Sequence, residues 1–242
     1  MPIGVLCNSL AIAIGGVLGA LFSDKLTDEL KEKLNLVFGV CATGMGVSSI
    51  VLMKNMPAVV LSLIVGTLIG VLIRLGRGIE RAGVALQHGM ARLLPNAASN
   101  QTEASTALMV TTIVLFCSSG TGIYGSIVSG MSGDHSILIA KSILDLFTSL
   151  IFACSLGAAV SVVAVPQLII FTLLFLCARR VYPLTTPVMI DDFKACGGFI
   201  LIATGLRIAK IREFPIADMI PAMALVMPLS AFWTSVVVPL IG

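Results

Sequence analysis

The sequence predicts an all-α membrane protein, a polytopic bundle of about eight transmembrane helices. Of its 242 residues, 57% are hydrophobic and 11% are charged, whereas a soluble domain carries about 25% charged residues. The apolar residues form long runs joined by short loops, without the strict alternation that a membrane barrel requires. We therefore expect a single transmembrane domain over residues 1–242, in contact with the lipid bilayer.

Eight runs are long enough to cross a bilayer, whose hydrocarbon core takes about 20 apolar residues per helical pass. Counted with the N-terminus outside, the loops on the inner side carry ten Lys and Arg residues and those on the outer side four. This imbalance favours both termini outside under the positive-inside rule, although the pair Arg179 and Arg180 runs against it. The runs are 3–22, 34–53, 57–75, 104–130, 136–156, 158–178, 191–209 and 216–240.

The longest connection, residues 76–102, has the pattern of a cytoplasmic amphipathic helix followed by a loop. Its apolar residues recur at helical spacing, and Arg77, Arg81 and Arg92 are among the polar positions. This pattern is typical of a helix that lies on the surface of the inner leaflet. It is equally typical of a helix that packs on its own bundle, so both interpretations stay open.

The first and last parts of the chain, residues 1–75 and 162–242, resemble each other weakly. Aligning 34–50 with 195–211 places Thr43 on Thr204 within matched Ala-Thr-Gly segments. Five passes separate the two copies, so their orientations would be opposite, as in many secondary transporters with a site near the midplane. The alignment predicts an inverted repeat with both threonines near the centre. Chance similarity of apolar segments, with each Thr bonded to its own helical turn, is the alternative.

The fourth run contains an internal break, since an apolar stretch is followed by Cys-Ser-Ser-Gly-Thr-Gly at 117–122. Each Gly inside a helix costs about 1 kcal/mol relative to Ala. Unwound backbone near the bilayer centre is tolerated only where protein or a wet cavity surrounds it. The break therefore predicts a broken helix that offers backbone and hydroxyl oxygens to an ion or solute. The predicted ligands are Ser118, Ser119, Gly120 and Thr121; close helix packing through small residues is the alternative.

The fifth run carries two charges, Lys141 and Asp145, four positions apart and therefore on one helix face. Each would be costly in lipid, so both should face the bundle interior. We expect Asp145 to bind a cation or proton, with Lys141 as a countercharge that a substrate cation displaces. Ser142 adds polarity to this site, and Asn8 on the first run lines it or joins helices by hydrogen bonds. A purely structural ion pair is the alternative.

No pattern predicts an enzyme, a cofactor or a metal site. The six cysteines lie in or beside apolar runs without a CxxC pair, and the two histidines lie outside the runs. Nucleotide-binding loops, zincin motifs and nucleophile elbows do not occur in the sequence. The net charge of +3, without a basic stripe, gives no support for a nucleic-acid partner.

Several of these motifs together resemble the YqgA-like family of bacterial inner-membrane proteins. The resemblance covers essentially the whole chain, and its most specific part runs from Gly133-Asp134 to Lys141-Ser142 and Asp145. It implies a multi-pass protein of the inner membrane, so that outside termini are periplasmic. The description of the family as a sodium channel or pump implies a role in cation passage, and no catalytic residue is implied. The family often has Gly-Pro where this chain has Gly120-Thr121, which weakens the predicted break.

The sequence thus predicts a gradient-driven transporter or channel for a small ion or solute, with sodium as a candidate. Asp145 is the predicted charge-sensitive element and Lys141 its partner. The alternative from another class is a non-transporting membrane scaffold or regulatory protein that acts through its basic cytoplasmic helix. In that case the segment Gly66 to Gly70 would serve a homo-oligomer interface.

Overall fold

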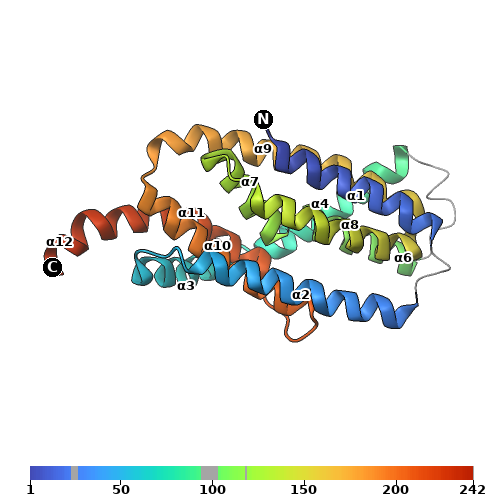
Figure 1. Ribbon diagram of the computed structural model, residues 1–242, viewed down its shortest axis with the longest axis horizontal. Helices are drawn as coiled ribbons and strands as arrows, with labels where there is room; N and C mark the ends of the chain where they lie inside the picture. The colour runs from blue at the N-terminus through green and yellow to red at the C-terminus, as the bar shows by residue number, and fades with distance from the viewer. Residues whose placement is uncertain (23–26, 94–102, 118, 242) are drawn as a thin grey trace. The chain divides into compact units, whose positions relative to one another are not determined.

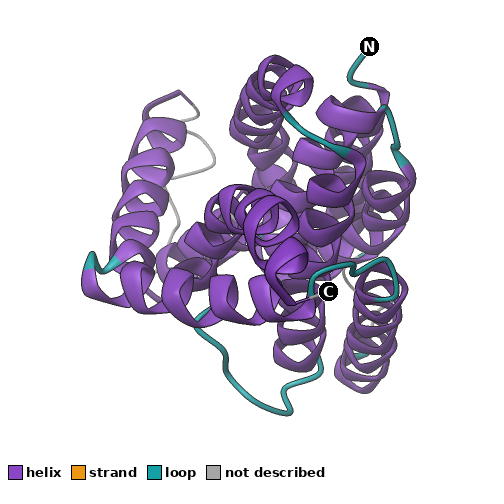
Figure 2. Cartoon of the chain, turned by 90° about the vertical axis from the view of Figure 1, so that its left-hand side faces the viewer, coloured by secondary structure: helices purple, strands orange, loops and turns teal. Residues whose placement is uncertain are grey.

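The computed structural model describes residues 1–22, 27–93, 103–117 and 119–241. In this part of the chain, helices are joined by loops and no strand occurs (Figure 2), which confirms the all-α prediction. Residues 94–102 of the predicted cytoplasmic loop and the predicted ligand Ser118 lie outside the described residues.

The helices follow the predicted runs closely (Figure 1). The fourth run is divided as predicted, because one helix ends at Cys117 and the next begins at Gly120. The α-helices are α1 (Ile3–Leu21), α2 (Asp28–Ile50), α3 (Met56–Leu72), α4 (Leu75–Leu93), α6 (Glu103–Cys117), α7 (Gly120–Ser132), α8 (Ser136–Leu156), α9 (Ala164–Val181), α10 (Pro187–Ile208), α11 (Ile216–Phe232) and α12 (Val238–Ile241). Short 3₁₀ segments, η2 (Gly157–Val163) and η3 (Tyr182–Leu184), and a π-helical turn, η4 (Trp233–Val237), connect some of them.

Within the described residues, five helical stretches are long and apolar enough to cross a membrane, and a sixth results if α3 and the start of α4 form one broken span. The stretch Ser136–Leu184 is 49 residues long and therefore holds two predicted passes, α8 and α9. Helix α10 is also long but is not one of these stretches. It carries three charged residues near its start, Asp191, Asp192 and Lys194. The five stretches are Ile3–Leu21, Glu32–Ile50, Thr112–Ser132, Ser136–Leu184 and Ile216–Leu240.

The chain divides into two compact units. The first unit comprises residues 1–35 and 77–179, and the second comprises 36–76 and 180–242. In the first unit, α1 packs along α8 in the parallel direction. A Cβ atom at Gly15 would overlap Leu146, and one at Gly19 would overlap Leu150. Small residues on α1 therefore bring the two backbones into direct contact, as is common between membrane helices.

Helix α4 packs into the first unit with one face. Gly83 is buried beside Val114, and Leu86 packs against the apolar core. Arg77 and Arg81 lie on the exposed face. One face of α4 thus packs on its own bundle, and contact of its exposed face with the inner leaflet stays a prediction.

The second unit is built on two antiparallel helix pairs that meet at glycines. A Cβ atom at Gly39 would lie 2.6 Å from the carbonyl oxygen of Gly205, and one at Gly46 would lie 2.6 Å from that of Gly198. These contacts join α2 to α10, and similar contacts join α3 to α11. The paired helices are those that the proposed inverted repeat would relate to each other.

The small residues of α3 pack within the second unit. Gly66 and Gly70, which would serve a homo-oligomer interface under the scaffold alternative, are both buried there. A Cβ atom at Gly66 would overlap Ala222, and one at Gly70 would overlap Asp218. Helix α11 therefore already covers the small-residue face of α3.

Candidate functional site

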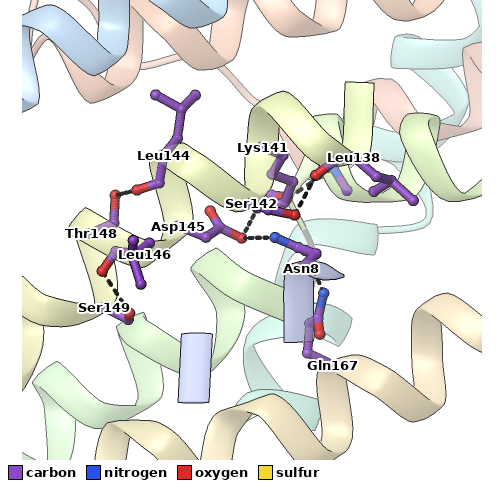
Figure 3. Close-up of polar contacts among 12 residues, drawn as sticks. Asn8, Leu138, Lys141, Ser142, Leu144, Asp145, Leu146, Thr148, Ser149 and Gln167 are labelled. Carbon is purple, nitrogen blue, oxygen red and sulfur yellow. Dashed lines mark hydrogen bonds and ion pairs between the residues drawn. The ribbon is translucent and has the colours of Figure 1, made fainter. Parts of the chain in front are cut away.

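Five polar side chains meet in the interior of the first unit, and we call them the polar cluster. Figure 3 labels four of them, Asn8, Lys141, Asp145 and Gln167. Asn8 and Ser9 come from α1, Lys141 and Asp145 from α8, and Gln167 from α9. None of the five is more than 6% exposed. The structure thus brings together three of the predicted site residues, Asn8, Lys141 and Asp145, as the sequence interpretation required.

The Asp145 carboxylate is the centre of this cluster. Lys141 Nζ donates a hydrogen bond of 2.6 Å to Asp145 Oδ2, and Asn8 Nδ2 donates one of 2.8 Å to the same oxygen. Within the described part of the chain, Asp145 Oδ1 has no hydrogen-bond donor. The carboxylate is therefore buried and charge-paired, and both of these hydrogen bonds fall on one of its oxygens.

A chain of hydrogen bonds extends from the carboxylate to α9. Gln167 Nε2 donates to Asn8 Oδ1 at 2.6 Å, and Ser9 Oγ donates to Gln167 Oε1 at 2.5 Å. Each donor thus points along the chain toward Asp145, so both amide dipoles stabilise its negative charge. Three helices contribute to holding one carboxylate in place.

One apolar cluster lies on each side of the polar cluster. Along α1, α8 and α9, the polar residues stand between residues of the first apolar cluster and residues of the second. The polar cluster is therefore a layer between apolar layers, where a low dielectric strengthens charge interactions. The successive residues are Val5, Asn8 and Ile12 on α1; Leu138, Asp145 and Ala153 on α8; and Phe171, Gln167 and Ala164 on the antiparallel α9.

The end of α6 lies beside the charged pair. The centroid of the Phe116 ring is 6.0 Å from Lys141 Nζ, at the outer limit for attraction between a cation and an aromatic face. The break in the fourth predicted run therefore adjoins the charges of the fifth.

The break itself is shorter than predicted. Ser119 is the N-cap of α7, and its hydroxyl accepts a hydrogen bond of 3.1 Å from the backbone N–H of Gly122. Gly120 and Thr121 are already helical, so the prediction that they form unwound backbone is wrong. The cap explains the difference, because it satisfies a backbone donor that a new helix would otherwise leave unpaired.

Three other predicted site residues bond to their own helices. Ser142 Oγ donates to Leu138 O at 2.6 Å, so its hydroxyl is not directed at the carboxylate of Asp145. Thr43 and Thr204 belong to the second unit and bond to the carbonyl groups of Gly39 and Ile200 respectively. Each threonine thus bonds to the preceding turn of its own helix, which is the alternative that the sequence analysis left open.

The sequence interpretation missed a second buried carboxylate, Asp192 in the second unit. Its Oδ1 accepts hydrogen bonds from the backbone N–H groups of Lys54 at 2.7 Å and Asn55 at 2.9 Å. Its Oδ2 accepts from Asn55 Nδ2 at 2.9 Å and from Ser230 Oγ at 2.6 Å. Both oxygens are thus fully used, at the N-terminus of α3 where a negative charge is favourable. We assign this carboxylate a structural role.

Two signals could have identified the missed residues. Asp191 and Asp192 together open an otherwise apolar run, and a buried acid needs several donors. Gln167 is a lone amide within an apolar run, which is the same signal that pointed to Asn8.

The fold and the polar cluster define a helical membrane protein with an ion pair inside its bundle. Residues 3–231 match the model of the DUF554 family of proteins of unknown function, and the chain belongs to this family. It is 47% identical over 235 residues to the uncharacterized protein YqgA of Escherichia coli K12, covering 97% of this chain and 99% of the relative. It is 24% identical over 229 residues to the uncharacterized membrane protein YdfK of Bacillus subtilis 168, covering 91% and 92% respectively. No solved structure matches the chain.

Proposed function

We propose that this protein is a gradient-driven transporter or channel for a small ion or solute, and that a monovalent cation such as sodium is the substrate. The proposal includes a bacterial inner-membrane location with both termini in the periplasm. The observation that carries it is the geometry of Asp145. This carboxylate is buried at 6% exposure, and both of its hydrogen bonds fall on Oδ2.

The chemistry of the polar cluster supports a cation as substrate. Hard cations take oxygen ligands from carboxylates, amides and hydroxyl groups. Asp145 Oδ1 supplies such a ligand, and the amide of Asn8 lies against the same carboxylate. A cation at Asp145 would compete with the Lys141 ammonium, which occupies the other oxygen at 2.6 Å. Asp192 differs in this respect, because each of its two oxygens accepts two hydrogen bonds.

The apolar layers favour a carrier over an open pore. A cation reaching Asp145 has to pass residues such as Leu138 and Phe171 from one side, or Ile12 and Phe116 from the other. A carrier opens one layer at a time, whereas a conducting pore needs both layers open together. We therefore favour a carrier in a closed state, although a closed channel would have the same two layers.

The test is radioactive sodium uptake into liposomes that contain the purified protein. We expect Asp145→Asn to reduce uptake to the level of protein-free liposomes, because the variant keeps the shape of the side chain and removes its charge. The matched control is Asp134→Asn, the same change at a half-buried position just before α8, where Asp134 Oδ1 accepts a hydrogen bond from the backbone N–H of Ser136. Equal uptake by wild type and Asp145→Asn would refute the proposed role of Asp145, and absence of uptake by the wild type would refute sodium transport.

The scaffold function remains the second candidate because α4 exposes Arg77 and Arg81 on one face. A scaffold that recruits a partner through this helix should lose activity in cells when both arginines are changed to Gln. It should tolerate Asp145→Asn. The transporter proposal expects the opposite sensitivities, so one pair of variants distinguishes the two functions.

A further inference from the structure

We infer that Asn8 turns its side-chain amide over when a cation binds, so that Asn8 Oδ1 becomes a ligand of the cation beside the Asp145 carboxylate. Gln167 and Ser9 turn with it, and we call the three side chains the amide relay. This inference rests on the proposed function and adds a second ligand and the residues that orient it. The carrying observation is that the contacts already present allow the hydrogen bonds of the relay to reverse.

In the described structure, the amide relay directs its donors toward Asp145. Ser9 Oγ donates to Gln167 Oε1, and Gln167 Nε2 donates to Asn8 Oδ1 at 2.6 Å. Asn8 Nδ2 donates in turn to the carboxylate of Asp145 (Figure 3). The carbonyl oxygen of Asn8 therefore faces Gln167. A cation at Asp145 would meet the NH₂ group of Asn8, which is a hydrogen-bond donor and cannot act as a ligand.

The hydroxyl group of Ser9 allows the direction of the relay to reverse. It carries one proton but has two acceptors within reach, Gln167 Oε1 at 2.5 Å and Val5 O at 3.1 Å. Val5 lies one turn earlier on α1, and a serine hydroxyl often bonds to the carbonyl group four residues before it. When the proton points to Val5 O, Ser9 Oγ can accept a hydrogen bond from Gln167 Nε2. The end of the relay thus serves as a donor or as an acceptor.

The two amides can turn without repacking of the helices. The oxygen atom and the NH₂ group of a carboxamide have nearly the same shape, and a half-turn about the terminal bond exchanges their places. After this turn, Asn8 Nδ2 donates to Gln167 Oε1, and Gln167 Nε2 donates to Ser9 Oγ. The relay then makes as many hydrogen bonds as before, and no group changes its protonation state.

Occupancy of the site decides the direction of the relay. Without a cation, the turn would place Asn8 Oδ1 where Nδ2 now lies, 2.8 Å from Asp145 Oδ2, and the two oxygens would repel each other. Asn8 and Gln167 are fully buried, so bulk water does not screen this repulsion. A cation between the two oxygens replaces the repulsion by coordination, because carboxylate and amide oxygens are ligands of hard cations. Because Gln167 belongs to α9, the turn also transmits the occupancy of the site to that helix.

The first test observes the side-chain amides by NMR of the protein in detergent, with isotope-labelled nitrogen in Asn and Gln, while NaCl replaces choline chloride. The chain has five Asn and three Gln residues, so the signals are few and single substitutions assign them. We expect the amide protons of Gln167 to gain a nuclear Overhauser contact with the β-protons of Ser9 when sodium binds. Asn55, whose amide donates to Asp192 in the second unit, is the internal control and should not change. Sodium binding that leaves the contacts of the Gln167 amide unchanged would overturn the inference.

The second test measures the contribution of the Asn8 oxygen to sodium affinity. Asn8→Leu removes this oxygen, and we expect the sodium Kd to rise at least about tenfold. Gln167→Leu keeps the Asn8 carbonyl group and removes its neighbour in both directions, so the Kd should stay within about threefold of the wild type although stability falls. Asn8→Asp keeps an oxygen at this position and should retain sodium binding.

A purely structural Asn8 predicts a different result. If Asn8 served only as a donor to Asp145, Asn8→Leu would leave the carboxylate more available to sodium, and the Kd would not rise. That result would refute the role of Asn8 as a ligand. The NMR measurement uses the wild type, so it decides the question even if Asn8→Leu fails to fold.

Sodium binding and uptake by the wild type separate failure of the relay from failure of the proposed function. If sodium binds and is taken up into liposomes while the Gln167 amide keeps its contacts, the relay is refuted and the transporter stands. If the wild type neither binds sodium nor takes it up, sodium transport and the relay are refuted together.

Discussion

Asn8 Nδ2 lies 2.8 Å from Asp145 Oδ2, although 137 positions separate the two residues in the sequence. This hydrogen bond joins the first helix of the chain to the helix that carries the charged pair. It forms where glycines on α1 bring the backbones of α1 and α8 into contact, with the apolar pair Val5 and Leu138 on one side of it. The position of the carboxylate therefore depends on packing between helices as well as on its own helix.

Replacing Asn8 should weaken the fold. In Asn8→Leu, Asp145 loses one donor and Gln167 Nε2 loses its acceptor, so buried polar groups remain unsatisfied at about 1–3 kcal/mol. We expect the free energy of unfolding in detergent to fall by this amount. The control is Asn35→Leu, a partly exposed position on α2. Equal stability of Asn8→Leu and wild type would show that the amide contributes nothing to the cluster.

The charged pair should behave as a unit in a double-mutant cycle. Removing one partner leaves an isolated buried charge, which costs about 3–5 kcal/mol, whereas removing both leaves none. We therefore expect Lys141→Met with Asp145→Asn to be more stable than either single variant. Unfolding midpoints of the four proteins measure the coupling, and additive effects would mean that the side chains do not interact in the folded protein.

The sequence allowed the charged pair and its partner Asn8 to be predicted for a physical reason. Polar groups in apolar runs have few ways to avoid lipid, and the spacing of Lys141 and Asp145 places both on one face of a helix. The helices could also be predicted, because long apolar runs coincide with them. The outcome for Gly120 and Thr121 was different, because glycine content alone does not reveal that a serine cap can restart a helix at once.

Contacts between distant segments could not be predicted from the sequence. Asp192 is held by the backbone N–H groups of Lys54 and Asn55, and any residue except proline supplies such a donor. The partner of Gln167 depends on the rotation of α9 about its axis, which weak apolar patterning does not define. Even the glycine faces of α3 were ambiguous, since the same pattern fits a neighbouring helix or a second copy of the chain.

The adjacent acids of α10 should differ sharply in their contribution to stability. Asp192→Ala removes the acceptor of four hydrogen bonds, three of them buried and one partly buried, and the donors left unpaired should cost about 3 kcal/mol or more. Asp191→Ala removes only a partly exposed ion pair with Lys54, which is worth about 0–1 kcal/mol. Denaturant unfolding of both variants tests this difference, and similar losses would contradict the structural role assigned to Asp192.

The proposed topology can be tested by labelling with a membrane-impermeant maleimide in cells. Leu184 is 80% exposed between α9 and α10, on the side proposed to be periplasmic. Gly78 is exposed on α4, on the side proposed to be cytoplasmic. After Cys7, Cys41 and Cys177 have been replaced by Ser, we expect Leu184→Cys to be labelled in intact cells. Labelling of Gly78→Cys should require permeabilised cells, and the reverse pattern would invert the topology.

Two glycines on the same helix should respond oppositely to alanine. A Cβ atom at Gly46 would lie 2.6 Å from the carbonyl oxygen of Gly198, so Gly46→Ala forces α2 and α10 apart. Such overpacking costs about 1–3 kcal/mol. A Cβ atom at Gly44 meets nothing within 4 Å, so Gly44→Ala should leave stability unchanged or raise it by up to about 1 kcal/mol, because Ala favours a helix over Gly. Thermal unfolding in detergent measures both. If Gly46→Ala proved as stable as Gly44→Ala, the direct backbone contact between α2 and α10 would not exist in the protein.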